Sequence, residues 1–272
     1  MKTISILLCC LCLSVASFTL SAQENKSRDY SVTHPWAGAK VAYLGDSITD
    51  AAVFKDDTHY WGFLNEWLDM EPLVYARSGH QWHQIAGQAD RLHNEHGDAF
   101  DAIIIFVGTN DYNAGVPIGE WFSEEKVVVN ADGEMVERIR RIPVMDQSTF
   151  RGRINVILDM LKRRYPSKQI VLMTPIHRAY ANFSEKNVQP DESHQNACGE
   201  YVDAYIASIK EASNLWSVPV IDLHAVSGLF PMHEEQATYF PGGNDWLHPD
   251  EDGHRRIART IFYQLLTIPC RF

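Results

Sequence analysis

The chain has 272 residues, of which 45% are hydrophobic and 22% are charged, and this fits one globular domain with a sizeable core. Its formal net charge of −11 argues against binding to nucleic acid or to an anionic membrane surface, because both need clustered lysine and arginine.

The first residues differ from the rest of the chain. Lys2 is followed by an apolar run from Ile4 to Leu13, and Ser21 and Ala22 are small residues before a polar segment. This pattern predicts a secretory signal peptide over residues 1–22, and hence an exported protein, periplasmic or extracellular. The apolar run is too short to be a membrane anchor, so we expect no stable membrane insertion.

Residues 23–35 are polar and aperiodic and predict a short arm leading into a single domain over residues 36–272. Two cysteines remain after the signal segment, Cys198 and Cys270. In an exported protein they could form a disulfide, or both could be buried free thiols. The sequence does not choose between the two.

Short apolar stretches alternate with segments of helical periodicity along the domain. The expected strands are Lys40–Leu44, Leu73–Ala76, Ala102–Val107, Gln169–Met173 and Val218–Leu223. The expected helices include Tyr60–Met70, Trp82–Leu92, a helix that begins near Ser148 or Thr149 and contains Ile154–Leu161, Tyr201–Ala212 and Ile257–Leu266. Continuous apolar strands between helices predict a doubly wound α/β fold whose parallel sheet is covered on both faces.

One segment interrupts the alternation, between about Tyr112 and Asp146. Asp132-Gly133 lies between two β-prone runs, which predicts an inserted β-hairpin. It follows the strand Ala102–Val107, so one interpretation is that it forms a wall of the functional pocket. An exposed decoration or an oligomer contact is the alternative.

A turn that contains a candidate catalytic residue follows the first expected strand. Gly45 breaks the apolar run, and Asp46, Ser47 and Thr49 favour the start of a helix or helical turn. In an open α/β sheet, ligands bind at the carboxyl ends of the strands. Ser47 is therefore a candidate nucleophile, although a helix-capping serine would show the same short pattern.

A hydrolytic serine needs a base to take its proton and an acid to orient that base. Asp245 and His248 can supply both, because a three-residue separation lets the carboxylate reach one ring nitrogen while the other points at Ser47. The order serine, aspartate, histidine is also that of the α/β hydrolases. The backbone N–H of Ser47, that of Gly79 and the side-chain amide of Asn110 could bind a developing oxyanion.

These blocks together resemble one known family. Gly45-Asp46-Ser47, Gly79, Gly108-Thr109-Asn110-Asp111 and Asp245-x-x-His248 are similar to the four blocks of the SGNH (GDSL-type) hydrolases. The resemblance implies a three-layer α/β/α fold, SGNH hydrolase-like and flavodoxin-like in its strand arrangement. It also implies a serine esterase with Ser47 as nucleophile, His248 as base and Asp245 as orienting acid. Ser47, Gly79 and Asn110 would form the oxyanion hole, and no metal or cofactor is required.

The family includes lipases, thioesterases and carbohydrate esterases, so the fold does not define the substrate. Trp82 and Trp246 lie close to the blocks in sequence and are candidate substrate-binding aromatics for a sugar. With the predicted export, they favour a small-molecule or glycan ester substrate and a carbohydrate O-acetylesterase. The alternatives are a lipid acyl-hydrolase or lysophospholipase, and a catalytically idle glycan-binding protein. The oligomeric state stays open.

A metal-dependent hydrolase is a further alternative, prompted by 12 histidines and by the aspartates Asp46, Asp50, Asp56 and Asp57. No His-Glu-x-x-His motif or comparable ligand spacing supports it.

Overall fold

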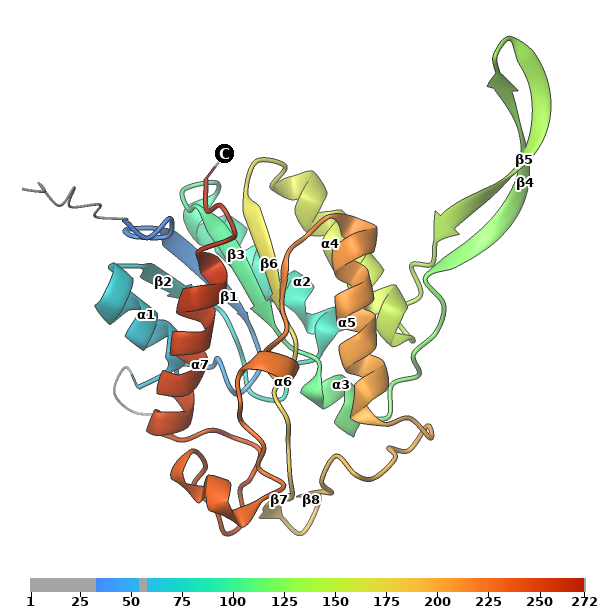
Figure 1. Ribbon diagram of the computed structural model, residues 1–272. Coiled ribbons are helices and arrows are strands. Elements are labelled where there is room, and N and C mark those ends of the chain that lie inside the picture. Colours follow the sequence, from blue (N-terminus) through green and yellow to red (C-terminus); the bar gives the residue numbers. More distant parts are fainter. Residues whose placement is uncertain (1–32, 54–57, 272) are drawn as a thin grey trace, which may run out of the picture. The chain divides into compact units, whose positions relative to one another are not determined.

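The computed structural model describes residues 33–53 and 58–271 (Figure 1). The predicted signal peptide over residues 1–22 and most of the predicted arm over residues 23–35 lie outside the described residues. No helix in the described ranges is long and apolar enough to cross a membrane.

The centre of the domain is a five-stranded parallel sheet. Its strands lie in the order β2-β1-β3-β6-β9, namely Glu71–Val74, Lys40–Gly45, Ala102–Phe106, Gln169–Met173 and Val220–Ile221. Strand β1 pairs with β2 on one side and with β3 on the other. The chain passes from β1 to β2 on one side of β1 and then crosses to β3 on the other side. Such a reversal of strand order places a ligand-binding crevice at the carboxyl ends of β1 and β3.

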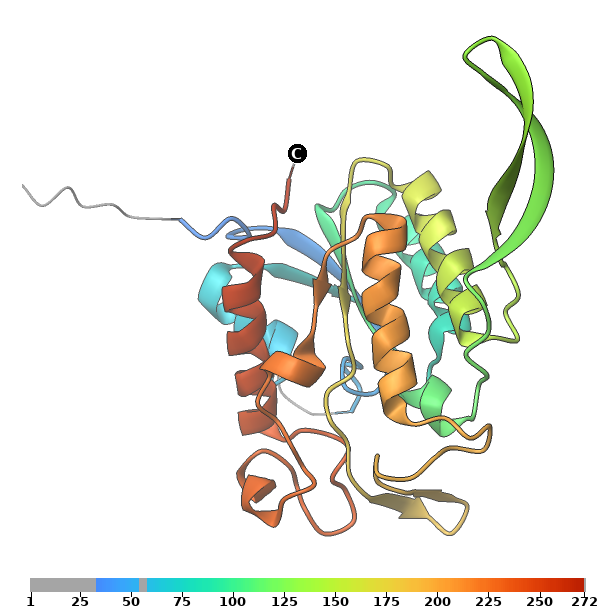
Figure 2. The ribbon, with the colours of Figure 1, turned by 45° about the vertical axis from the view of Figure 1, so that its right-hand side comes forward.

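Helices cover both faces of the sheet, as Figures 1 and 2 show. The long helices are α1 (Tyr60–Leu68), α2 (Ile85–His96), α4 (Phe150–Arg164), α5 (Val202–Trp216) and α7 (Glu251–Leu265). Along β1, Val41 and Tyr43 pack in the core shared with α1 and α7, whereas Ala42 and Leu44 pack with α2, α4 and α5. This alternation of a strand buried on both faces confirms the predicted three-layer α/β/α fold.

The predicted elements agree with the structure except at some boundaries. Strand β2 begins two residues earlier than expected, and β9 contains only Val220–Ile221. The helix expected from Trp82 begins as a 3₁₀ turn, η1 (Trp82–Gln84), before α2. Helix α7 begins well before Ile257, because Asp250 caps it by accepting a hydrogen bond from the N–H of Gly253.

The inserted hairpin is present as β4 (Phe122–Ala131) and β5 (Glu134–Pro143). Asp132 and Gly133, with φ of 55° and 89°, form its two-residue turn. Positive φ at both positions matches the twist of a hairpin, which explains why the Asp-Gly signal was specific. The two strands project away from the helices that flank the sheet (Figures 1 and 2).

Short elements that the sequence did not predict complete the domain. They are α3 (Thr109–Asn113), a second hairpin of β7 (Ala181–Ser184) and β8 (Asn187–Gln189), α6 (Leu223–Val226) and the 3₁₀ turn η2 (Glu234–Thr238). Both remaining cysteines are free thiols, Cys198 exposed and Cys270 buried. The disulfide alternative is therefore not realised, and burial of the thiol holds for Cys270 alone.

Candidate active site

The turn after β1 holds Ser47 at the carboxyl edge of the sheet. A Cβ atom at Gly45 would lie 2.5 Å from the carbonyl oxygen of Phe106, so only glycine lets β1 and β3 approach here. The N–H groups of Thr49 and Asp50 both donate to the carbonyl of Asp46, at 3.1 and 3.0 Å. The expected helical start is thus a single turn rather than a regular helix.

Asp245 and His248 reach this turn from the loop before α7. The Oγ of Ser47 lies 2.8 Å from Nε2 of His248, and Nδ1 of His248 lies 2.9 Å from Oδ2 of Asp245. The other carboxylate oxygen of Asp245 accepts the backbone N–H groups of Leu247 and His248, each at 3.0 Å. One carboxylate therefore fixes both the loop and the imidazole.

The charge of Asp245 determines how protons are arranged in this chain of contacts. Burial on its own would raise the pKa of Asp245, but the hydrogen bonds from the ring and backbone of His248 hold this pKa below its ordinary value. An ionised carboxylate only accepts, so Nδ1 of His248 donates to it. In the neutral ring, Nε2 is then the acceptor for the hydroxyl proton of Ser47, which is the arrangement of a general base.

A cavity of about 360 Å³ opens above these side chains. Its lining includes every catalytic and oxyanion-hole residue that the sequence singled out: Ser47, Gly79, Asn110, Asp245 and His248. Segments far apart in the chain thus meet around one space, at the carboxyl ends of β1 and β3 as the fold predicts.

The three expected oxyanion donors are available to a ligand. Among the described residues, the backbone N–H groups of Ser47 and Gly79 have no hydrogen-bond partner. The side-chain amide of Asn110 donates to the carbonyl of His80 at 3.1 Å, which leaves its second N–H. Gly79 has φ of 78°, a backbone conformation that a side chain would strain. All three donors border the cavity, so they suit an oxyanion formed there.

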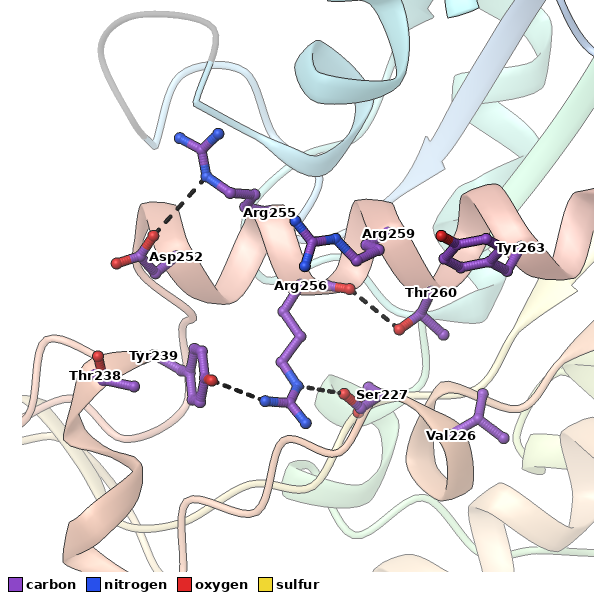
Figure 3. A pocket seen from close by; sticks show the side chains of 10 residues that line it. All are labelled: Val226, Ser227, Thr238, Tyr239, Asp252, Arg255, Arg256, Arg259, Thr260 and Tyr263. Carbon is purple, nitrogen blue, oxygen red and sulfur yellow. Dashed lines mark hydrogen bonds and ion pairs between the residues drawn. The ribbon is translucent and has the colours of Figure 1, made fainter. Parts of the chain in front are cut away.

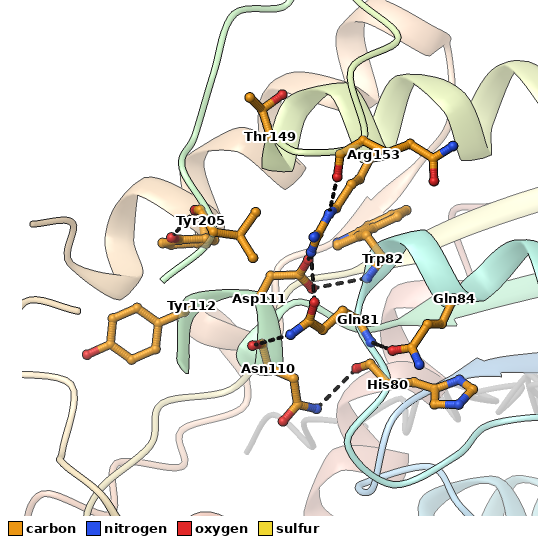
Figure 4. A network of polar contacts seen from close by, with 12 residues as sticks. His80, Gln81, Trp82, Gln84, Asn110, Asp111, Tyr112, Thr149, Arg153 and Tyr205 are labelled. Carbon is orange, nitrogen blue, oxygen red and sulfur yellow. Dashed lines mark hydrogen bonds and ion pairs between the residues drawn. The ribbon is translucent and has the colours of Figure 1, made fainter. Parts of the chain in front are cut away.

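The carboxylate of Asp111, next to Asn110, is in a buried ion pair with Arg153 of α4 and also links this loop to the segment that begins at His80 (Figure 4). Asp111 accepts from the backbone N–H of Trp82 at 3.1 Å and from Nη1 of Arg153 at 2.7 Å. The same Arg153 nitrogen donates to Oε1 of Gln81 at 2.8 Å, and Nε2 of Gln81 reaches the carbonyl of Asn110 at 3.3 Å. Burial raises the pKa of Asp111 to about 6, although Arg153 opposes the rise. The sequence predicted Asn110 but missed Arg153, which lies on α4.

A second carboxylate lies beside Ser47. Asp46 is 2% exposed, and its Oδ1 accepts the N–H of Ile48 at 3.2 Å. Burial raises the pKa of Asp46 to about 7, against the opposing effects of the Ile48 N–H and of nearby His248. Near neutral pH this carboxyl group is therefore close to its own titration.

The hairpin β7–β8 forms a wall of the cavity that the sequence missed. Phe183, Asn187 and Gln189 line it, and the Phe183 ring lies 5.2 Å from the His248 ring, centroid to centroid. Gln189 is held by Nη2 of the buried Arg178 at 2.7 Å, and Arg178 also reaches Thr109 beside the Asn110 loop. The segment has no clear periodicity, so the sequence analysis did not predict this hairpin.

Three expectations about the cavity wall need correction. Trp82 is fully buried and packs edge-on against Phe150, so it cannot contact a ligand. Trp246 is not in the cavity lining, because its ring packs beside Phe240 and over Gly242. No residue of the hairpin β4–β5 lines the cavity either, and the interpretation of this insertion as a pocket wall is wrong.

No group of three or more histidine, cysteine, aspartate or glutamate side chains is placed to hold a metal ion within the ranges that the structure describes. Asp56 and Asp57, which prompted part of the metal alternative, lie outside those ranges.

The comparisons with known proteins agree with this geometry. The model of the GDSL-like Lipase/Acylhydrolase family matches residues 43–256, from β1 to α7. A search of curated proteins finds no significant match. A protein of known structure from Lactobacillus plantarum is 25% identical, with a TM-score of 0.64 over 84% of this chain and 97% of its own. A possible lipase from Chitinophaga pinensis DSM 2588 is 20% identical and shares the fold, with a TM-score of 0.60 over 83% and 97%. Because the family model covers most of the domain, including every block of the site, the chain belongs to the GDSL-like lipase/acylhydrolase family.

Proposed function

We propose that this protein is an exported serine esterase that acts through an acyl-enzyme, and that its substrates are O-acetylated carbohydrates. The observation that carries the serine chemistry is the continuous contact from Asp245 through His248 to Ser47, at 2.9 and 2.8 Å. A binding protein has no need of such a relay, so it argues against the idle glycan-binding alternative.

In the proposed reaction, the Oγ of Ser47 attacks the ester carbonyl while Nε2 of His248 takes the hydroxyl proton. The carbonyl oxygen becomes an oxyanion bound by the N–H groups of Ser47, Gly79 and Asn110. His248 then gives its proton to the leaving alcohol as the ester bond breaks. Water, deprotonated by His248, attacks the acyl-enzyme and releases the acid, which restores Ser47.

The cavity wall formed by the hairpin β7–β8 supports a sugar as the alcohol part of the substrate. Asn187 is exposed, and its Oδ1 accepts from Gln189 at 3.0 Å, which leaves the amide N–H groups free to donate. The Phe183 ring is 42% exposed beside them. Amide groups next to an aromatic face suit a ring that carries hydroxyl groups. The cavity of about 360 Å³ is at the small end of ligand sites, as expected for a short acyl group.

A lipid acyl-hydrolase is the second candidate, favoured by a different observation. Val53 and Phe183 line the cavity and are 39% and 42% exposed, so an apolar rim borders the site. An acyl chain could lie on this rim.

Export rests on the N-terminal sequence alone. The apolar run of residues 4–13, followed by the small residues Ser21 and Ala22, supports removal of a signal peptide before the arm. N-terminal sequencing of the protein recovered outside the cytoplasm tests this, and a first residue at Gln23 is the expected result.

Hydrolysis of 4-nitrophenyl acetate, butyrate and octanoate by the purified domain tests the chemistry and the acyl preference together. We expect the highest kcat/KM on acetate and loss of activity in Ser47→Ala, with full activity in Ser123→Ala, a control on the exposed strand β4. Release of acetate from acetylated xylan then tests the substrate class. Preference for octanoate together with release of fatty acid from lysophospholipid would instead establish the lipid candidate.

A further inference from the structure

A second cavity, of about 600 Å³, is lined by a different set of residues from the catalytic one (Figure 3). It is bordered by α7 and by the chain around α6 and η2, and none of its lining residues lines the catalytic cavity. Arginines 255, 256 and 259 all come from α7. Three guanidinium groups around one space are unusual in a chain whose formal net charge is −11.

The three arginines differ in how their charge is balanced. Arg255 pairs with Glu251 at 2.8 Å and approaches Asp252 at 3.8 Å, and it lies over the Phe63 ring. Figure 3 shows it pointing away from Arg256. The charge of Arg255 is thus neutralised by carboxylates of its own helix.

Arg256 is held only by neutral groups. Its Nε donates to the carbonyl of Ser227 at 2.7 Å, and its Nη1 donates to the hydroxyl of Tyr239 at 2.8 Å. Its Nη2 lies where a side chain on Gly228 would have to be, 2.2 Å from the Cβ position, so the absence of that side chain leaves room for the guanidinium. These contacts fix the fork of Arg256 and leave Nη2 without a hydrogen-bond partner in the described chain.

Arg259 follows Arg256 on the same face of α7 and is exposed. Across residues 33–53 and 58–271, no carboxylate pairs with Arg256 or with Arg259. Two guanidinium groups that have no carboxylate partner in the described ranges therefore border the cavity, which the carboxylate of Asp252 also lines. A guanidinium fork matches the two oxygens of a carboxylate.

The remaining wall suits a polyhydroxylated ring. The Tyr239 ring lies 4.8 Å from the Arg256 guanidinium, and Tyr263, which is 61% exposed, lies farther along α7 (Figure 3). Thr238 and Thr260 add hydroxyl groups. The volume is far larger than a simple inorganic anion needs. The net negative charge of the chain also opposes a dianionic phosphate more than a singly charged carboxylate.

We propose that this cavity is a binding subsite for a sugar acid, with the carboxylate of a uronate residue on Arg256 and Arg259 and its ring against the tyrosines. The site is separate from the ester-hydrolysing cavity, and binding there requires no turnover. Failure of this proposal therefore leaves the proposed esterase activity untouched, and the reverse also holds.

Calorimetric titration of the whole domain with a galacturonate trisaccharide tests the proposal, with the matching neutral trisaccharide, sodium acetate and inorganic phosphate as comparisons. We expect the uronate to bind at least about tenfold tighter than each comparison at low salt, and to weaken at high salt. Arg259→Gln should lower its affinity about tenfold without changing the unfolding midpoint.

Arg138→Gln is the matched control, because it removes an exposed arginine of β5 whose only described hydrogen bond is to the carbonyl of Glu137. It should bind the uronate as the unchanged chain does, and so should Ser47→Ala. Equal binding of the neutral sugar, equal binding of acetate or phosphate, or undiminished binding by Arg259→Gln would each overturn the proposal.

Discussion

The side-chain amide of Gln88 forms two hydrogen bonds with the backbone of Gly45, accepting from its N–H and donating to its carbonyl, each at 2.8 Å. Gln88 lies on α2 and is 2% exposed. It thus completes the hydrogen bonding at the end of β1, two residues before Ser47. The position of the proposed nucleophile depends on a side chain from another element, and not only on its own turn.

Replacing Gln88 with methionine should move Ser47 as well as destabilise the domain. The buried N–H of Gly45 would lose its partner, at about 1–3 kcal/mol, whereas its carbonyl would keep the N–H of Arg77 at 3.2 Å. We expect a lower unfolding midpoint and a kcat reduced at least about tenfold, with little change in KM. Gln264→Met, on an exposed face of α7, is the control. A variant that is less stable but keeps its kcat would show that Gln88 has a structural role only.

The amide of Asn110 should contribute mainly to the transition state. Because it would bind the oxyanion more strongly than the ester, Asn110→Ala should lower kcat about 100- to 1,000-fold at nearly constant KM. Asn113→Ala, at the exposed end of the same short helix, should retain full activity. Steady-state kinetics on 4-nitrophenyl acetate measure both. A rise in KM with unchanged kcat in Asn110→Ala would exclude its proposed role.

Removal of Arg153 should leave Asp111 buried without its cation. The Asp111 side chain is fully buried, and breaking such a pair costs about 3–5 kcal/mol. In Arg153→Met the pKa of Asp111, already raised to about 6 by burial, should rise further. Denaturant unfolding should therefore show a loss of stability that grows between pH 5 and pH 8.

The double variant Arg153→Met, Asp111→Asn tests the cause of that loss. It contains no buried charge at this position, so the added pH dependence should disappear. Persistence of the same pH dependence in the double variant would mean that another group titrates.

Local sequence patterns predict most of the sheet and the inserted hairpin, but they do not predict how these elements pack. The strands β1 and β3 are continuous apolar runs, and Asp132-Gly133 determines a two-residue turn, so the sheet and the inserted hairpin could be predicted. The direction in which the hairpin projects depends on packing at its base, which no residue of the turn encodes. Its expected place at the pocket was therefore wrong.

The catalytic residues were predicted from the sequence, but the residues that form the cavity wall were not, because their positions depend on tertiary packing. Ser47, Asp245 and His248 stand in a recognisable order, and the structure brings them together. Phe183 and Gln189 belong to an irregular segment, and Gln189 is held at the cavity by Arg178, a buried residue with no sequence signal. Trp82 follows a chemical block closely, but proximity in sequence does not tell whether an aromatic ring faces the solvent or the core.

Asp46 should make stability depend on pH in the direction opposite to that of a salt-bridged carboxylate. Its pKa is raised from 3.8 to about 7 in the folded state, so the folded state holds this proton more tightly than the unfolded chain. The stabilising contribution is complete below about pH 4 and is lost as pH rises through about 7.

Comparison of Asp46→Asn with the unchanged chain measures this effect. Since asparagine does not ionise, the difference in unfolding free energy between the two should change in favour of the variant by on the order of 2–4 kcal/mol from pH 4 to pH 8. A difference that stays constant across this range would show that Asp46 titrates near its ordinary pKa.

The central claim is that Ser47 is the nucleophile, and covalent labelling tests it most directly. A fluorophosphonate should inactivate the enzyme with one adduct per chain, and peptide mass spectrometry should locate that adduct on Ser47. His248→Ala should react far more slowly, because Ser47 would lose its base. An adduct on another residue, or full esterase activity in the labelled protein, would contradict the account.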